Sequence, residues 1–404
     1  MARCVRAPRP NPANPGGHRG EIGGKRSGSG GIRVLEQGEP AGNRRRRSGP
    51  PVPGFGGADR RIDGEIRRGG DDPPADRHPA RPRDRGHPGA AGAVRDRDPP
   101  QAVLGERGGQ VNYREIFAEL SNRGRWGEED QRGTLNYITP AKVKDALALV
   151  RSGRVVSIGR DLDTVSGPSN PRPVVHYLLY AAHHPEATMD FVGIAPHGLS
   201  VTHLDAVGHV YFEGEMYNGR QAAEEVDRYG MRFGSIEAMA EGVVTRGVFL
   251  DVASALGVDY LDPNACIGPK ELEAAEEYWG VEAEAGDAVL VRSGRMVHES
   301  GDDPPEPGRR AGLDIDAIRW LHRREVAVYG GDCIERMPSP YPGLELPLHS
   351  LGLAGMGLAL LDWPDTEALR EACSAEGRAE FVLMMAPLRL RGGTGSAVNP
   401  LCIF

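Results

Sequence analysis

Three histidines and an aspartate crowd into thirteen residues near the middle of the chain, namely His197, His203, Asp205 and His209. In an extended chain alternate side chains share a face, so His197, His203 and Asp205 would point the same way from a strand. An aspartate supplies negative charge and a neutral imidazole supplies a nitrogen, and together they can bind one divalent cation. The spacing therefore predicts a metal site at this strand.

His209 follows this strand after a glycine, Gly208, that would allow the chain to turn. The turn would leave the His209 imidazole beside the cation but not bound to it. An imidazole there can take a proton from a water molecule that the cation has made more acidic. The alternative is that these are hydrogen-bonded polar residues of a half-buried strand. Because burying an unpaired aspartate is costly, the cluster as a whole favours the metal site.

The composition of the chain changes abruptly near residue 110. Residues 1–110 hold 22 of the 49 basic and 13 of the 57 acidic residues, and 38 of them are Gly or Pro. A segment so poor in large apolar side chains cannot offset the entropy of ordering itself, so we expect a disordered tail. The remaining 27 basic and 44 acidic residues make 111–404 strongly acidic.

The tail itself allows two interpretations. Its arginine run at 44–47 is the one candidate for contact with nucleic acid or for a localisation signal. The other interpretation is that the tail is not translated in the cell and that the natural chain begins near Val111. For the folded part, the acidic balance argues against nucleic-acid binding, which needs clustered Lys and Arg.

Location is constrained by hydropathy and by the cysteines. No window of 18 consecutive apolar residues exists, so no membrane span is expected, and no apolar core follows the first basic residues as a secretory signal requires. Reduced thiols in a cytoplasmic protein are the simplest interpretation of cysteines that are few, odd in number and free of C-x-x-C pairs. They are Cys4, Cys266, Cys333, Cys373 and Cys402.

From residue 111 onward, the spacing of apolar residues predicts helices and strands that follow one another in an irregular order. The helices expected from their stripes and capping residues are 113–120, 139–150, 269–279, 314–323 and a last one from Asp365 through Cys373. The expected strands are 155–158, 247–252, 288–291 and 326–329. Since strands and helices do not alternate strictly, we predict a mixed-sheet α/β domain over 111–404 and not a doubly wound nucleotide fold.

The central motif also resembles a known family. Residues 202–209, Thr-His-Leu-Asp-Ala-Val-Gly-His, resemble the signature H-x-G-T-H-x-D-x-P-x-H of the cyclase family, which includes bacterial kynurenine formamidases and isatin hydrolases. Three further segments, at 124–136, 286–295 and 392–400, are similar to the family's opening segment, an internal strand and turn, and the closing segment. The resemblance thus covers residues 111–404 and implies a swivelling β/α/β domain.

The resemblance implies roles for individual residues. His203 and Asp205 match family metal ligands, and His209 matches the histidine thought to act as acid and base. His349 matches a later histidine that completes the metal site. Asp362 matches the acid that follows this histidine in the family's metal site, a position where a glutamate is more usual.

Two positions depart from the signature. Its first histidine falls on Leu199 and its proline falls on Val207, which weakens the case for a two-metal site. His197 lies two residues earlier on the same predicted face, so we expect it to substitute for the missing ligand.

The function implied is hydrolysis of a carbon–nitrogen bond in a formyl or cyclic amide, with Zn or Mn as cofactor, a small-molecule substrate and a homo-oligomeric state. Trp126, Tyr211 and Tyr217 are candidates to contact an apolar or aromatic substrate, with core packing as the alternative, and Asp332 is a candidate pocket residue or a turn former. Two other functions stay open, namely a family member without tightly bound metal and a non-catalytic small-molecule binding protein.

Overall fold

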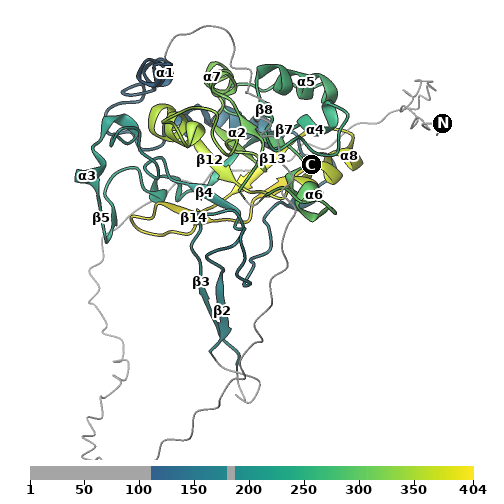
Figure 1. Cartoon of the computed structure of the whole chain (residues 1–404), viewed down its shortest axis with the longest axis horizontal. Helices are drawn as coiled ribbons and strands as arrows, with labels where there is room; N and C mark the ends of the chain where they lie inside the picture. Colours follow the sequence, from purple (N-terminus) through teal and green to yellow (C-terminus); the bar gives the residue numbers. More distant parts are fainter. Residues whose placement is uncertain (1–110, 180–186, 307) are drawn as a thin grey trace, which may run out of the picture. The chain divides into compact units, whose positions relative to one another are not determined.

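The computed structural model describes residues 111–179, 187–306 and 308–404 (Figure 1). The tail predicted at 1–110 and the histidine pair His183 and His184 lie outside the described residues. Among the helices of the described part, none is long and apolar enough to cross a membrane.

A nine-stranded sheet forms the centre of the described part, with the strand order β1-β15-β13-β7-β9-β11-β12-β4-β14. Its strands are β1 (Val155–Ser157), β4 (His203–Asp205), β7 (Val243–Asp251), β9 (Ala288–Arg292), β11 (Val328–Gly331), β12 (Ala359–Asp362), β13 (Glu380–Met385), β14 (Gly395–Ala397) and β15 (Leu401–Ile403). The pairs joining β7, β9, β11 and β12 are parallel, whereas the pairs toward both edges are antiparallel. The prediction of a mixed-sheet α/β fold is confirmed.

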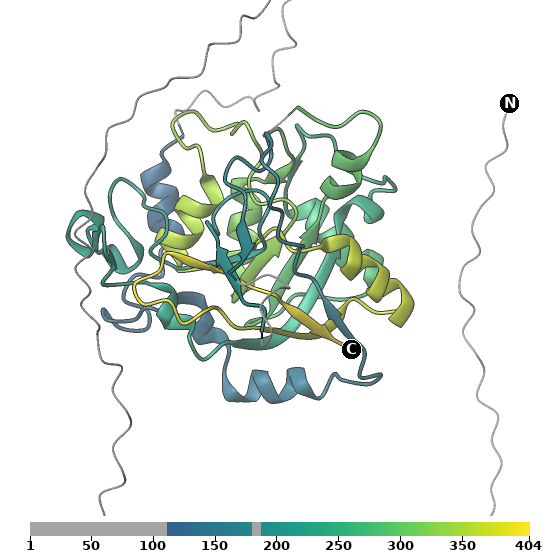
Figure 2. The ribbon, with the colours of Figure 1, turned by 90° about the horizontal axis from the view of Figure 1, so that it is seen from below.

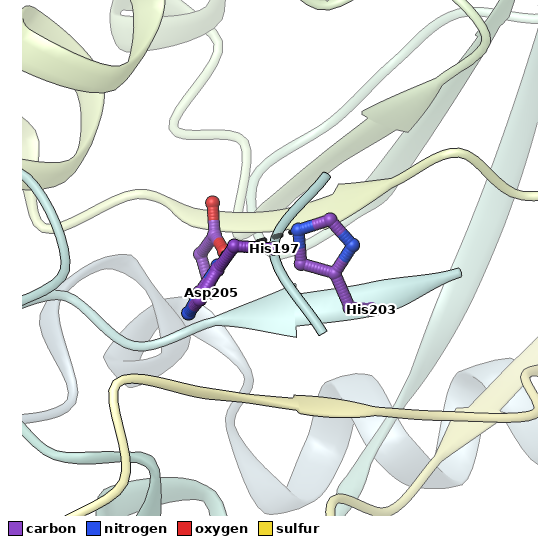
Figure 3. Close-up of side chains that lie close together, drawn as sticks. All are labelled: His197, His203 and Asp205. Carbon is purple, nitrogen blue, oxygen red and sulfur yellow. Dashed lines mark ion pairs between the residues drawn. The ribbon is translucent and has the colours of Figure 1, made fainter. Parts of the chain in front are cut away.

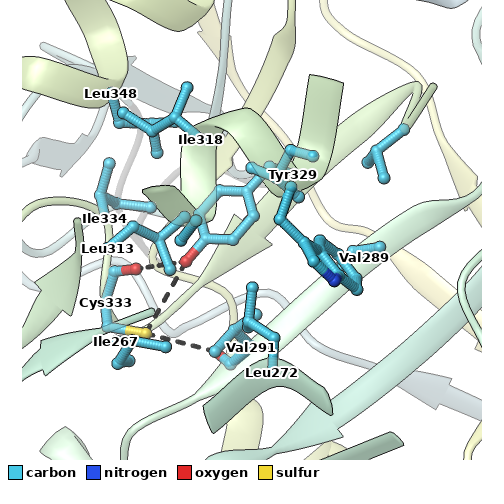
Figure 4. Close-up of a cluster of buried hydrophobic side chains, with 14 of the residues drawn as sticks. Ile267, Leu272, Val289, Val291, Leu313, Ile318, Tyr329, Cys333, Ile334 and Leu348 are labelled. Carbon is cyan, nitrogen blue, oxygen red and sulfur yellow. Dashed lines mark hydrogen bonds between the residues drawn. The ribbon is translucent and has the colours of Figure 1, made fainter. Parts of the chain in front are cut away.

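Alternation along the central strands divides the core into two layers. In β9, Val289 and Val291 pack into one buried cluster, while Ala288 and Leu290 pack into another. Successive side chains of a strand point to opposite faces of the sheet, so a run of apolar residues along a strand is buried on both faces. Helices accordingly cover both faces, as the two perpendicular views show (Figure 1, Figure 2). The first cluster also holds Tyr329, whose hydroxyl donates to the Cys333 carbonyl at 2.5 Å (Figure 4).

The helices begin and end where their capping residues indicate. The Thr139 hydroxyl accepts a hydrogen bond from the Lys142 amide, and Gly280 ends its helix with a left-handed φ of 64°. The α-helices are α1 (Tyr113–Leu120), α2 (Pro140–Leu147), α3 (Ala222–Glu225), α4 (Val252–Ala255), α5 (Pro269–Trp279), α6 (Arg295–Ser300), α7 (Ile315–Arg323) and α8 (Thr366–Glu376). The 3₁₀ and π segments are η1 (Gly133–Tyr137), η2 (Tyr217–Gly219), η3 (Ile236–Met239) and η4 (His349–Met356).

Several predicted boundaries are wrong. The helix expected over 139–150 ends at Leu147, and the strand expected over 247–252 is β7, Val243–Asp251. The strand expected at 326–329 is β11, at Val328–Gly331, because its pairing with β9 and β12 starts at Val328. The amide of Val326 bonds instead to the Leu321 carbonyl at the end of α7. A further error concerns the extended strand expected from His197 to Asp205.

This last strand is only three residues long. β4 pairs with β12 on one side and β14 on the other over His203–Asp205, and His197 lies before it in an irregular loop. His197 is therefore positioned by this loop, whereas the sequence predicted that strand alternation would position it.

Three two-stranded sheets lie outside the main sheet. They are β2 (Val175–Leu178) with β3 (Asp190–Gly193), β8 (Cys266–Ile267) with β10 (Gly312–Leu313), and β5 (Val226–Asp227) with β6 (Gly230–Met231). The β2–β3 hairpin projects from the body of the described part (Figure 1), and its residues are exposed on both strands.

Candidate metal centre

Strand β4 places two polar side chains in the interior. His203 and Asp205 point to the same face, while Leu204 between them packs into the second apolar cluster. Both polar side chains are almost completely inaccessible to solvent. The neighbouring strand β12 brings Asp362 opposite His203 in the register of the sheet. The sheet therefore fixes two carboxylates and an imidazole within a few ångströms.

His197 joins this group from the loop before β4 (Figure 3). Its Nδ1 lies 2.9 Å from Oδ1 of Asp205, and its Nε2 lies 2.9 Å from the Thr394 hydroxyl. The ring packs directly on Gly395, where an added Cβ would fall 2.6 Å from Cε1 of His197. Only a glycine at the start of β14 leaves room for this imidazole.

His349 approaches Asp205 from the opposite side. Its Nε2 lies 3.2 Å from Oδ2 of Asp205 and 3.6 Å from Oδ2 of Asp362. The potential ligand atoms fall into two groups, each within 4.8 Å: one of His197, His203 and Asp205, and one of Asp205, His349 and Asp362. Asp205 belongs to both groups.

Each of the three imidazoles has one nitrogen held by a second partner, which leaves the other directed at the carboxylates. Nδ1 of His203 donates to the Val201 carbonyl at 2.8 Å, which leaves Nε2 with a free lone pair 3.5 Å from Asp205. Nδ1 of His349 is 2.5 Å from Oε1 of the buried Glu335. Metal-binding histidines in proteins usually have such a second partner, because it fixes the ring and its tautomer.

The carboxylate of Asp205 lacks the partners that burial demands. Both of its oxygens are buried and make no hydrogen bond with any described residue, although three imidazole nitrogens lie nearby. Oδ1 of Asp362 is in the same situation. Because buried polar atoms nearly always have a partner, these oxygens suit a divalent cation, and the mixed N and O donor set is one that Zn²⁺ or Mn²⁺ accepts.

The electrostatics indicate the same need for positive charge. Burial alone would raise the pKa of Asp205, but the imidazoles of His197 and His349 outweigh it and hold that pKa well below its usual value. For His349, burial would lower the pKa, but the carboxylates of Glu335, Asp205 and Asp362 raise it well above the usual value. A proton on His349 thus balances charge where a cation would otherwise do so.

His209 lies beside the cluster as an unprotonated imidazole. Its amide donates to the Ala206 carbonyl at 2.9 Å, so the chain turns directly after β4. Its ring stacks on that of His197 with centroids 3.6 Å apart. Burial lowers its pKa to about 4, and nearby imidazoles add to this against the opposing effect of Asp205. His209 is therefore a neutral base at neutral pH.

Gly208 allows this turn because it has no side chain, and not because its backbone adopts an unusual angle. Its φ is outside the left-handed region, and an added Cβ would lie 2.2 Å from Cε of Met231 and 2.5 Å from Cε of Met216. The turn expected at this glycine is present, but close packing is its physical reason.

A cavity of about 460 Å³ opens onto these side chains. It is lined by polar groups of the cluster, two arginines and an apolar wall, namely Arg172, His197, Gly198, Leu199, His203, His209, Val210, Arg310, Ile334, Glu335, Leu346, His349, Asp362 and Trp363. The structure thus brings His203, Asp205 and His209 close to His197, His349 and Asp362. Their roles as ligands and as proton carrier stay predictions.

The four residues predicted to contact substrate do not line this cavity. Tyr217 is fully buried and donates to Asp130 at 2.9 Å, so it packs in the core. Trp126 packs edge-on against Tyr137, with ring centroids 5.1 Å apart. Tyr211 lines a separate, neighbouring hollow.

Asp332 is the fourth of these residues, and the structure gives it the turn-forming role. Its carboxylate accepts hydrogen bonds from the backbone amides of Ser293, Gly294 and Arg295, at the start of α6. It thereby stabilises the turn that follows β9, and it does not face the cavity.

Four polar or aromatic residues of the cavity were not predicted from the sequence, namely Arg172, Arg310, Glu335 and Trp363. Glu335 comes shortly after the carboxyl end of β11, where α/β sheets commonly place their ligands, and that signal was available. Arg310 and Trp363 lie in irregular segments with no periodic pattern. Only the folded chain shows that they reach the cavity.

A comparison with models of known protein families identifies the family of this chain. The cyclase family model, described as "Putative cyclase", matches residues 131–335, just over half of the chain. The chain belongs to the cyclase family. The match includes the segment from His197 to His209 and ends at Glu335. A search of curated proteins finds no match.

Solved structures of other cyclase-family proteins resemble this chain. A structure described as a novel cyclase is 27% identical, with a TM-score of 0.63, and the match covers 70% of this chain and 99% of that one. Isatin hydrolase A from Labrenzia aggregata, bound to benzyl benzoate, is 23% identical with a TM-score of 0.44, covering 62% and 93%. Isatin hydrolase A from Ralstonia solanacearum is 22% identical with a TM-score of 0.45, covering 62% and 91%.

The contact between Glu335 and His349 generates a prediction. We expect Glu335→Gln to weaken metal binding about 10- to 100-fold, because the neutral amide orients the imidazole less firmly and lowers its basicity. Equilibrium dialysis against Zn²⁺ or Mn²⁺ measures this affinity. Glu325→Gln, at an exposed ion pair with Arg125, is the control and should bind metal normally. Unchanged affinity in Glu335→Gln would show that Glu335 does not support a ligand.

Proposed function

We propose that this cyclase-family protein is a metal-dependent hydrolase that cleaves a carbon–nitrogen bond in an amide, formamide or cyclic amide. The observation that carries the proposal is the carboxylate of Asp205, which is buried among imidazoles with neither oxygen hydrogen-bonded to a described residue. A buried anion without a partner is costly, and a divalent cation removes that cost. The choice of a carbon–nitrogen bond follows from the resemblance of the motif to the formamidases and isatin hydrolases of the family.

The ligands that we propose are His197, His203 and Asp205 for one ion, with Asp205, His349 and Asp362 available to a second. His197 takes the place of the signature histidine that Leu199 replaces. A bound Zn²⁺ or Mn²⁺ would supply Lewis-acid polarisation of a carbonyl and would lower the pKa of water. The donor set suits either ion, and we propose both as candidates.

His209 is the residue that we propose to move protons. It lines the cavity beside the ligands without belonging to either ligand group. As a neutral imidazole at neutral pH, it can accept a proton from water and then donate it to the departing nitrogen. Its stacking on His197 holds the ring in place.

Two other functions remain, and each makes a different experimental prediction. A family member without tight metal would keep activity after exhaustive chelation. A non-catalytic binding protein would bind metal or small molecules without turnover. The unpartnered oxygens of Asp205 and Asp362 favour metal binding over the metal-free alternative, and turnover of an amide separates the enzyme from the binding protein.

The role of His209 can be tested by substitution. We expect His209→Ala to lower kcat by about 100- to 10,000-fold, the usual contribution of a general acid–base group, while metal content stays as in the wild type. Activity is measured on a panel of N-formyl and cyclic amides, and bound metal by elemental analysis.

The matched control is His322→Ala, because this histidine lies on α7 outside the cavity. It should leave kcat unchanged. Hydrolysis that survives His209→Ala at the wild-type rate would contradict the proposed proton transfer, and loss of metal in that variant would make His209 a ligand instead.

The homo-oligomer implied by the family resemblance is also a proposal. The β2–β3 hairpin exposes Tyr177 and Phe191 as a stacked pair, 4.9 Å between centroids, with Val175, Leu178 and Val192 also exposed. A two-stranded hairpin is only marginally stable by itself, so burial against a second copy would stabilise it. We expect light scattering to give a mass above that of one chain and Phe191→Ser to lower it. A monomeric wild type would contradict this proposal.

A further inference from the structure

We propose that Arg310 recognises an anionic group of the substrate, so that this chain acts on amides carrying a carboxylate or a similar planar anion. The inference rests on the proposed function, in that the molecule bound in this cavity is taken to be a substrate. The negative charge of that molecule is inferred from the structure.

Arg310 lines the same cavity as the proposed ligands and His209. Its Nε is buried and has no hydrogen-bond partner among the described residues. A guanidinium has five N–H donors in a rigid fork, and a buried donor without an acceptor is unfavourable. An acceptor entering the cavity would satisfy it.

The backbone holds Arg310 in position. Its amide donates to the Met337 carbonyl at 3.1 Å, and the Met337 amide donates back at 2.9 Å. The guanidinium also lies over the indole ring of Trp363, 5.3 Å from the centroid. A guanidinium stacked on an aromatic ring keeps its N–H edge free for a ligand in the ring plane.

Two acidic residues of the cavity, Glu335 and Asp362, act on Arg310 through space. Glu335 is engaged through Oε1 by His349 at 2.5 Å, while its Oε2 has no hydrogen-bond partner among the described residues, and Asp362 is a proposed metal ligand. Neither carboxylate is hydrogen-bonded to the buried Nε of Arg310, so this donor is available to a bound molecule.

A second cation, Arg172, lies at the same cavity, with its Nη2 3.4 Å from the His197 carbonyl. Two arginines beside one cavity are unusual in a folded part that carries 27 basic and 44 acidic residues. The rest of the wall is apolar, with Leu199, Val210 and Leu346. Cations beside an apolar wall fit a compact acyl compound with one anionic end, since arginine binds carboxylates with two parallel hydrogen bonds.

Benzoate and benzamide provide a probe pair that differs mainly in charge. We expect wild-type protein, loaded with Zn²⁺, to bind benzoate more tightly than benzamide in calorimetric titrations. Arg310→Met should weaken benzoate binding by about tenfold or more, the effect of losing a charge-assisted hydrogen bond, and leave benzamide unchanged. Arg310→Lys keeps the charge without the fork, so its affinity for benzoate should be intermediate.

The control is Arg309→Met, whose side chain pairs with Glu306 away from the cavity. It should bind both probes like the wild type. Equal affinity of the wild type for the two probes, or benzoate binding that is the same in Arg310→Met, would overturn the inference. Because benzoate can also bind the zinc ion directly, unchanged benzoate binding in Arg310→Lys overturns it if the methionine variant fails to fold.

Binding separates this inference from the proposed function, because neither probe needs to be hydrolysed. Protein that hydrolyses no amide but binds benzoate through Arg310 would contradict the hydrolase and support the anion site. Hydrolysis of neutral amides in preference to their carboxylate-bearing analogues, with Arg310→Met unaffected, would support the hydrolase and contradict the anion site.

Discussion

The carboxylate of Asp205 is the group on which the rest of the site depends. It lies in the interior, within 2.9 to 3.5 Å of imidazole nitrogens from His197, His203 and His349, yet it accepts no hydrogen bond from a described residue. A chain that buries an ionised carboxylate at this depth must supply compensating charge. The three imidazoles and the orphaned oxygen of Asp362 are arranged so that a cation can provide it, and the functional proposal follows from this arrangement.

The sheet explains why the arrangement is stable. β4 lies between β12 and β14, so His203, Asp205 and Asp362 are fixed by backbone pairing and are not carried by mobile loops. Partners outside the cluster then orient the rings, with a carbonyl for His203, the Thr394 hydroxyl for His197 and the Glu335 carboxylate for His349. Such preorganisation places donor atoms before any ligand binds, which lowers the cost of binding it.

Local patterns in the sequence predicted much of the fold. Capping residues and apolar stripes located α1, α5 and α7, because these signals act within one element. Pairing partners are nonlocal, so the shift of β11 and the shortness of β4 could not be predicted. The motif predicted His203, Asp205 and His209 near one another, but the route of His197 over Gly395 depends on β14, nearly two hundred residues away. Glu335 and Arg310 were missed for the same reason, and Tyr217 and Trp126 pack elsewhere because aromatic residues serve cores more often than cavities.

The metal stoichiometry of wild-type protein and of Asp205→Asn shows whether the Asp205 carboxylate holds a cation. Both proteins are stripped with a chelator, dialysed against Zn²⁺ or Mn²⁺ and analysed for bound metal, with circular dichroism confirming that the variant is folded. We expect at least one bound ion per chain in the wild type and loss of tight binding in the variant, because asparagine keeps the shape of the side chain and removes its charge. Equal metal content in the two folded proteins, or none in the wild type, would contradict this expectation.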